Sequence, residues 1–168
     1  GVGYARRSDA QKGTPEPGEE VVLLGGDNYR IGMGGGAVSS VNTGQYAGAI
    51  ELNAVQRSNP EMQKRVENVI RTLSESEDNP IISIHDHGAG GHLNCLSELV
   101  ETTGGHFDLS AFPIGDETLS SKEIIGNESQ ERMGLLVKGD AVERIARIAE
   151  RERAPMYVVG RTTDDMHL

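Results

Sequence analysis

Two glycine-flanked acidic segments contain most of the side chains that could do chemistry. The segment 85–91 places Asp86 between two histidines at the end of an apolar run, and it includes three glycines. Glycine lets the backbone approach a ligand closely, because it has no side chain. The segment 127–132 contains amide, hydroxyl, carboxylate and guanidinium groups, although a structural turn needs far fewer polar groups. Polar groups at this density indicate a ligand-binding role.

Asp86 is suited to a hard cation such as Mg²⁺. This ion takes one or two carboxylates and leaves its other positions to water and phosphate oxygens. The alternative role is an N-cap of the following helix, although Gly88–Gly91 separates Asp86 from the start of that helix. The sequence favours the metal-binding role.

Three histidines raise the alternative of a zinc site. His85 and His87 share one face of an extended strand, and His92 follows nearby. Three protein ligands are enough for a catalytic zinc ion. Against this, His92 is expected on the next helix, and no carboxylate stands at the helical spacing of a zinc protease. A zinc-dependent hydrolase built on these histidines is the less favoured alternative.

The segment 127–132 also has a purely structural interpretation. Asn127 and Ser129 are common turn residues, and Glu131 with Arg132 would form an exposed ion pair that contributes little to stability. However, the segment leads directly into an apolar run at 133–137, so its side chains would be held at the mouth of a rigid strand. The sequence therefore favours contact with a ligand.

The stretch from 25 to 36 contains six glycines and precedes a candidate helix start at 37–40. Its glycine spacing matches neither the P-loop nor the dinucleotide-binding pattern. Free N–H groups at a helix start still favour phosphate, so Gly34, Gly35 and Gly36 form a candidate phosphate site. An ordinary surface loop is an equal alternative.

The elements that would position these segments alternate along the chain. Short apolar runs predict buried strands, and apolar residues that recur every three to four positions predict helices. One helix has clear start signals, because Asn59 is a good N-cap and Pro60 fits the first helical position. Strands are expected at 21–24, 81–84, 133–137 and 156–160, helices at 60–73, 93–100 and 142–149, and an irregular connection with a short edge strand at 109–117. This pattern predicts an α+β fold, a layered α/β domain with a mixed sheet covered by helices.

Composition restricts the class of protein. The 168 residues fit one domain with a single core. The net charge of −10 disfavours nucleic acid and anionic membranes as partners, because both require basic surfaces. The single cysteine, Cys95, excludes an internal disulfide and fits a reducing compartment. No apolar stretch approaches the roughly 18 residues of a membrane-spanning helix.

The chain begins at Gly1 rather than Met and ends after Leu168, and we expect it to be a piece of a longer polypeptide. Residues 1–16 are polar and interrupted by glycine and proline, which predicts a linker or a segment of a preceding domain. Residues 17–163 form the expected domain, and residues 164–168 begin the following segment.

Several segments, in order along the chain, resemble the phosphoribosylformylglycinamidine synthases of the purine pathway. They are Gly34–Ser40, Val55–Met62, His85–Gly91, Asn127–Met133 and Arg151–Pro155. The resemblance extends from about Pro17 onward and is to the large, single-polypeptide form. It implies a C-terminal-type domain of the aminoimidazole ribonucleotide synthetase superfamily.

The resemblance implies a function as well as a fold. The complete enzyme converts formylglycinamide ribonucleotide, ATP and glutamine to formylglycinamidine ribonucleotide; ATP activates the formyl-amide oxygen, and ammonia from glutamine displaces phosphate. By matching motifs, Gln56, Glu128, Ser129 and Gln130 would bind the ribonucleotide, and Asp86 would bind Mg²⁺. ATP and Mg²⁺ are the implied cofactors, since phosphoryl transfer depends on positioning and charge neutralisation.

The resemblance implies that the partners are these small molecules and the remaining domains of the same polypeptide. It also implies that the protein is located in the cytoplasm. The segment alone is expected to be inactive, because its companion domain is absent from the sequence. Cys95 lies among apolar residues of an expected helix, which indicates an inert thiol rather than a glutaminase nucleophile. A structural domain that keeps the fold without the site is a second alternative.

Overall fold

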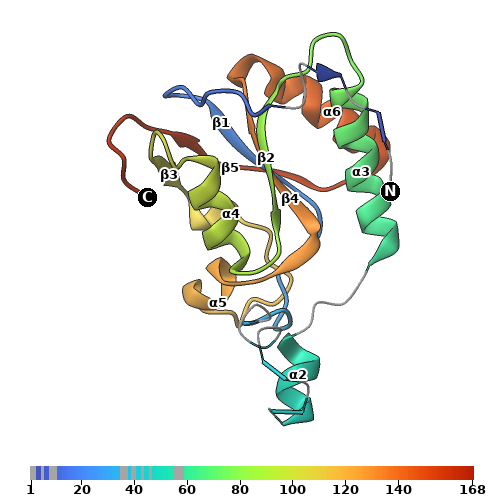
Figure 1. The fold of residues 1–168 in the computed structure, drawn as a ribbon, viewed down its shortest axis with the longest axis vertical. Coiled ribbons are helices and arrows are strands. Elements are labelled where there is room, and N and C mark those ends of the chain that lie inside the picture. Colours follow the sequence, from blue (N-terminus) through green and yellow to red (C-terminus); the bar gives the residue numbers. More distant parts are fainter. Residues whose placement is uncertain are drawn as a thin grey trace.

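The computed structural model describes residues 3–4, 6–7, 11–34, 38, 41–42, 44–45, 47–54 and 59–168, and at 51–53 the backbone alone. One sheet with helices on both faces forms the body of the molecule (Figure 1). The strands are β1 (Glu20–Leu24), β2 (Ile81–His87), β3 (Gly105–Phe107), β4 (Ser129–Val137) and β5 (Met156–Thr162). The helices are α2 (Gly48–Ala54), α3 (Pro60–Ser74), α4 (Gly91–Leu99), α5 (Ser121–Ile125) and α6 (Val142–Glu152), with short 3₁₀ turns η2 (Leu109–Ala111) and η3 (Gly139–Ala141).

The sheet has the strand order β2-β4-β1-β5-β3, and every pairing between these strands is antiparallel. The prediction of a layered α+β domain is confirmed, but the sheet is antiparallel rather than mixed. The expected strands and helices alternate, and alternation alone does not determine which strands become neighbours. Here β1 lies between β4 and β5, two strands that are distant from it in the sequence.

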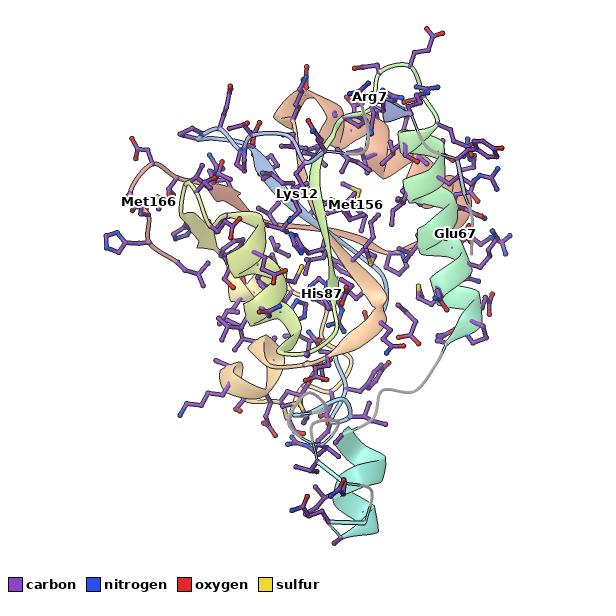
Figure 2. All side chains as sticks on the ribbon, in the orientation of Figure 1. Arg7, Lys12, Glu67, His87, Met156 and Met166 are labelled. Carbon is purple, nitrogen blue, oxygen red and sulfur yellow. The ribbon has the colours of Figure 1, made fainter. Side chains whose placement is uncertain are left out.

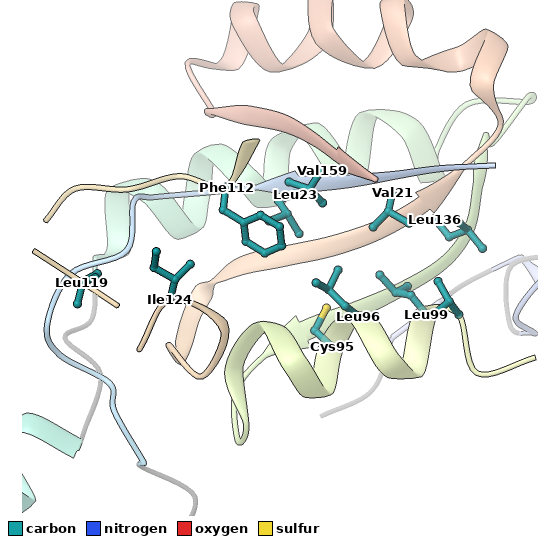
Figure 3. Packing of buried hydrophobic residues seen from close by; sticks show 11 residues of the cluster. Val21, Leu23, Cys95, Leu96, Leu99, Phe112, Leu119, Ile124, Leu136 and Val159 are labelled. Carbon is teal, nitrogen blue, oxygen red and sulfur yellow. The ribbon is translucent and has the colours of Figure 1, made fainter. Parts of the chain in front are cut away.

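β1 is buried on both faces because helices cover both sides of the sheet. Val21 and Leu23 pack with residues of α4, whereas Val22 and Leu24 pack with residues of α3 and α6. All four side chains are fully buried. Burial of each stabilises the fold by roughly 1.5–3 kcal/mol. Figure 3 shows the cluster on the α4 side of the sheet, where Leu96 and Leu99 face the strands.

α3 begins where the sequence predicts it. Asn59 is the N-cap, and its side-chain oxygen accepts a hydrogen bond from the N–H of Met62. Val66, Val69 and Leu73 recur on the buried face of this helix. The start of α3 is therefore fixed by a capping residue at one end of the sheet.

Other elements differ from the predicted bounds. The short edge strand is β3, which precedes the predicted range 109–117. α5 was not predicted, although Ser120 and Glu123 form a capping box at its start. β2 and β4 are longer than expected, because the polar residues at 85–87 and 129–132 continue the strands. None of the helices in the described residues has the length and apolar character needed to span a bilayer.

Gly134 of β4 marks a point where α4 packs directly on the strand. A Cβ atom at this position would lie 2.5 Å from Cys95 Sγ and 3.1 Å from Leu99 Cδ1. Both distances are shorter than ordinary van der Waals contact. The close approach of α4 to the sheet thus depends on the absence of a side chain at Gly134.

We expect Gly134→Ala to lower the free energy of unfolding by about 1–3 kcal/mol, because overpacking displaces α4 from β4. Urea denaturation monitored by circular dichroism measures this change. Gly139→Ala is the matched control, since the atom nearest to its added Cβ is 3.9 Å away. Equal unfolding free energies for the two variants would contradict the packing explanation.

Candidate functional site

A pocket of about 460 Å³ lies where β1 ends and β4 begins. The loop after β1, the start of α3 and the first half of β4 form its walls. Its lining residues are Gly26, Asp27, Tyr29, Arg30, Ile31, Asn59, Met62, Asn127, Glu128, Ser129, Glu131 and Arg132. The pocket therefore combines most of the polar segment 127–132 with the glycine-containing loop after β1.

Arg132 lies at the base of the pocket with only 1% of its surface exposed. Its Nε donates to the carbonyl oxygen of Gly26 at 3.1 Å, and its Nη2 donates to the carbonyl oxygen of Asp27 at 3.4 Å. Its two terminal nitrogens donate to the backbone and side-chain oxygens of Asn127, each at 3.4 Å. Burial lowers the pKa of Arg132 to about 10, against the opposing effect of nearby carboxylates, so the guanidinium remains charged near neutral pH. One cation thus connects the two walls of the pocket.

His92 also accepts a hydrogen bond from Arg132, whose Nη1 lies 3.0 Å from His92 Nε2. The ring is therefore neutral with its proton on Nδ1, because a protonated Nε2 cannot accept. The side-chain oxygen of Asn28 lies 3.1 Å from the same nitrogen, whose single lone pair is used by Arg132 in this tautomer. Burial, followed by the charge of Arg132, lowers the pKa of His92 far below its ordinary value.

His87 lies in the interior of the molecule (Figure 2). Its ring centroid is 4.6 Å from that of His92, in an edge-to-face arrangement. Its Nδ1 lies 3.2 Å from the carbonyl oxygen of Arg132. Burial and, to a smaller extent, the charge of Arg132 lower the pKa of His87 to about 3. Both histidines are therefore neutral parts of the core around Arg132.

Two glutamates of the pocket bind the starts of two helices. The N–H of Gly90, which precedes α4, donates to Glu128 Oε1 at 3.2 Å. The N–H of Asn59, which precedes α3, donates to Glu131 Oε1, and Ser129 Oγ donates to Glu131 Oε2 at 3.0 Å. A carboxylate is favourable at these positions because a helix N-terminus carries partial positive charge.

Gly91 allows α4 to start against the segment 127–132. Its φ is +59°, and a Cβ atom here would lie 2.5 Å from the carbonyl oxygen of Asn127. A side chain would meet both backbone strain and a clash with backbone atoms. The glycines of 88–91 therefore permit close approach, although the approaching group is the chain itself.

Asp27 and Arg30 are held by residues from different parts of the chain. Tyr157 of β5 donates its hydroxyl to Asp27 Oδ1 at 3.1 Å, and burial together with Asp27 raises the pKa of Tyr157 to about 12. Arg30 donates to the carbonyl and hydroxyl oxygens of Thr118 at 3.0 and 2.9 Å, and it pairs with Glu123. The mouth of the pocket is thus ordered by contacts with β5 and with residues 118–123.

The predicted substrate-binding residues separate into two places. Glu128, which is 8% exposed, and Ser129 line the pocket. Gln130 lines a neighbouring groove of about 510 Å³ along α3, with Glu131 between the two cavities. Gln56 lies outside the described residues.

Gln130 follows Ser129 on β4, so strand alternation directs the two side chains to opposite faces, and the pairing with β2 is also irregular here. Asp86 pairs with Met133 and His87 pairs with Ser129, so the register of β4 against β2 shifts between these two pairs. Such a bulge changes the direction in which successive side chains point.

Asp86 is exposed at the end of β2, and it lines neither the pocket nor the groove. Its Oδ1 accepts a hydrogen bond from the N–H of Gly88 at 2.7 Å. Gly34 is exposed with a φ of +76°, whereas Gly35 and Gly36 lie outside the described residues.

The structure gives no support to the alternative zinc site. His85 Nδ1 lies 2.5 Å from Glu98, and its other ring nitrogen contacts Lys12. His87 and His92 instead lie in the interior beside Arg132. Within the part of the chain that is described, no three His, Cys, Asp or Glu side chains group closely enough to hold a metal ion.

Sequence reasoning missed three residues that order the pocket: Asp27, Asn28 and Tyr157. It also considered that Arg132 could be exposed, but the side chain is buried in the structure. Alternation along β4 gives no signal for Arg132, because Glu131, Leu135 and Val137 on the other face of the strand are buried as well. No local pattern connects Asp27 with Tyr157, since they meet only through sheet pairing.

The sequence matches the family described as AIR synthase related protein, C-terminal domain, over residues 16–168. A probable phosphoribosylformylglycinamidine synthase, chloroplastic/mitochondrial, of Arabidopsis thaliana is 45% identical over 161 residues, which are 95% of this chain and 11% of that protein. The phosphoribosylformylglycinamidine synthase of Homo sapiens is 42% identical over 170 residues, covering 100% of this chain and 13% of that protein. The chain thus spans only a small part of these curated relatives.

Solved structures show the same similarity. T. maritima PurL complexed with FGAR has a TM-score of 0.81 and 27% identity, and the match covers 92% of this chain and 25% of that chain. T. maritima PurL complexed with ATP has a TM-score of 0.72 and 25% identity, with 92% of this chain and 23% of that chain covered.

We expect the buried neutral state of His92 to make stability depend on pH. Below about pH 6.5 an unfolded histidine takes up a proton, whereas folded His92 stays neutral. Stability therefore decreases as the pH falls from 6.5 to 5, with a slope for this one group that rises toward about 1.4 kcal/mol per unit. His92→Gln removes the titration and keeps an acceptor for Arg132, so its unfolding free energy will change less over this range.

Urea denaturation at several pH values measures this dependence. His106→Gln replaces an exposed histidine and is the control for the substitution itself. If His92→Gln and the wild type show the same slope between pH 6.5 and 5, His92 is not buried in its neutral form.

Proposed function

The chain belongs to the family of C-terminal domains of AIR synthase related proteins. We therefore propose that it is part of a phosphoribosylformylglycinamidine synthase and that it binds formylglycinamide ribonucleotide. In this proposal the complete enzyme is an ATP-dependent carbon–nitrogen ligase linked to a glutamine amidotransferase. The relatives are much longer than this chain, so the remaining domains would supply the glutaminase and the rest of the ATP site.

The observation that carries the proposal is the convergence of the segment 127–132 on one pocket. Glu128 and Ser129, predicted from the motif to bind substrate, both line it. Arg132 fixes the segment through a hydrogen bond to the loop after β1, and Glu131 fixes it through a hydrogen bond from the start of α3. The solved relative complexed with FGAR supports the choice of ligand, because its fold matches this chain with a TM-score of 0.81.

The contribution of this chain is to bind and orient rather than to form a covalent intermediate. Positioning alone can supply a large part of the rate enhancement in such reactions. Cys95 is fully buried, and burial raises the pKa of its thiol to about 12. Such a thiol is a poor nucleophile, which agrees with the expectation that the glutaminase lies elsewhere and that this chain alone is inactive.

Asp86 is the proposed ligand of Mg²⁺ in the nucleotide complex. Its exposed carboxylate, oriented by the N–H of Gly88, fits an ion that keeps water and phosphate oxygens as its other ligands. When bound, Mg²⁺ would neutralise charge on the phosphates of ATP. The relative complexed with ATP supports nucleotide binding by this family. A cytoplasmic location stays a prediction, since the Arabidopsis relative is described as chloroplastic/mitochondrial.

We expect the wild-type chain to bind formylglycinamide ribonucleotide saturably in isothermal titration calorimetry. Glu128→Gln keeps the size of the side chain and an acceptor for Gly90, but removes the charge from the pocket. Its affinity will fall by about tenfold, as expected for loss of one charge-assisted hydrogen bond.

Glu143→Gln is the matched control, because Glu143 lies on α6 and pairs only with Arg147 among the described residues. It will bind as the wild type does. A well-folded wild-type chain that does not bind the ribonucleotide would show that the proposed site is wrong.

We also expect Mg²⁺ to strengthen the binding of ATP to the wild-type chain, compared with binding in the presence of EDTA. Asp86→Asn will lose most of this difference, because the amide carries no charge to attract the ion. The control Asp164→Asn changes an exposed carboxylate outside the pocket and the groove, and will keep the difference. If Asp86→Asn retains the full effect of Mg²⁺, Asp86 is not the metal ligand.

A further inference from the structure

The arginines of the pocket are already occupied by other parts of the protein. Arg132 is buried, and its N–H groups donate to the chain around it. Arg30 is directed to Thr118 and Glu123, with Asp116 3.8 Å away. Both guanidinium groups therefore direct most of their hydrogen bonds to the protein itself rather than into the pocket.

The start of α3, which also faces the pocket, is occupied as well. The N–H of Asn59 donates to Glu131, and the N–H of Met62 donates to the side chain of Asn59. A phosphate at this helix start would displace the carboxylate of Glu131 and be repelled by it. The pocket therefore does not suit the anionic part of a ribonucleotide.

The pocket instead offers hydrogen-bond acceptors. Asp27, Glu128 and Glu131 all line it, and Asp27 is the most exposed of the three. Asp27 Oδ1 accepts from the hydroxyl of Tyr157. Within the part of the chain that the structure describes, no hydrogen bond reaches Asp27 Oδ2. This oxygen is available to a donor on a ligand.

An apolar wall faces these acceptors. Tyr29, which is half exposed, lines the pocket together with Ile31 and Met62. A pocket that joins an apolar wall to a few placed polar groups is typical of small-molecule sites. Hydroxyl groups on a sugar ring match this combination better than a phosphate does.

We infer that Asp27 binds the ribose hydroxyl groups of the ribonucleotide, and that the phosphate lies outside the pocket. This inference rests on the proposed function and names the part of the substrate that the pocket receives. Carboxylates bind ribose hydroxyls in the same way in dinucleotide-binding folds. Tyr157 is a positioning residue, because its hydroxyl orients the carboxylate of Asp27 without facing the ligand itself.

Calorimetric titration with four ligands tests the inference. They are formylglycinamide ribonucleotide, its 2′-deoxy and 3′-deoxy analogues, and the analogue without phosphate. The wild type will bind the ribonucleotide about tenfold more tightly than at least one deoxy analogue. Asp27→Asn will lose this preference, whereas the exposed control Asp140→Asn will keep it.

The phosphate gives an internal comparison. Its removal will weaken binding by the same factor in the wild type, Asp27→Asn and Asp140→Asn, because the phosphate does not contact Asp27. Tyr157→Phe will reduce the preference for the hydroxylated ligand and leave the phosphate factor unchanged. A change in general stability alone would alter neither ratio.

The outcomes separate the inference from the proposed function. If the wild type binds the ribonucleotide but binds both deoxy analogues equally well, or if Asp27→Asn keeps the preference, the inference is wrong and the proposed function stands. If Asp27→Asn changes the phosphate factor instead, the phosphate lies beside Asp27 and the inference is also wrong. Absence of ribonucleotide binding would contradict the proposed function and, with it, this inference.

Discussion

A buried guanidinium must find an acceptor for each of its N–H groups, and the architecture of the pocket follows from how Arg132 does so. Its acceptors come from the loop after β1, from Asn127 before β4 and from His92 on α4. Loss of any one contact would leave a buried polar group unsatisfied, which costs about 1–3 kcal/mol. Three segments far apart in the sequence are therefore held at one point.

The hydrogen-bond partners of Arg132 in the described part of the chain are mostly neutral, so the nearby carboxylates do not form direct hydrogen bonds with its guanidinium. Its direct acceptors are carbonyl oxygens, the amide of Asn127 and a histidine that cannot be protonated beside it. The nearest carboxylates, Asp27 and Glu131, act on the charge without accepting its hydrogen bonds through their side chains. They remain directed to the pocket and to the start of α3. The charge of Arg132 is buried at the base of the pocket, and Asp27, Glu128 and Glu131 add carboxylates to the same lining.

Local patterns in the sequence predict the elements well because each depends on near neighbours. Asn59 and Pro60 mark the start of α3 through contacts within one helical turn. The pocket depends on pairings between distant strands, and these determine that Tyr157 meets Asp27. The bulge opposite Asp86 and His87 could not be read from alternation either, since alternation assumes a regular strand. Gln130 lines a groove away from Glu128, which precedes the strand.

The same side chains stabilise the fold and form the wall of the pocket. Glu128 and Glu131 bind the helix starts through backbone N–H groups, so their positions are fixed by the fold before any ligand arrives. A ligand that meets fixed acceptors loses less affinity to the ordering of side chains. The arrangement also weakens the binding of anions in the pocket, because a helix start that already holds a carboxylate no longer attracts phosphate. The fold therefore prepares this pocket for groups that donate hydrogen bonds, and the charged part of a ribonucleotide must be neutralised elsewhere.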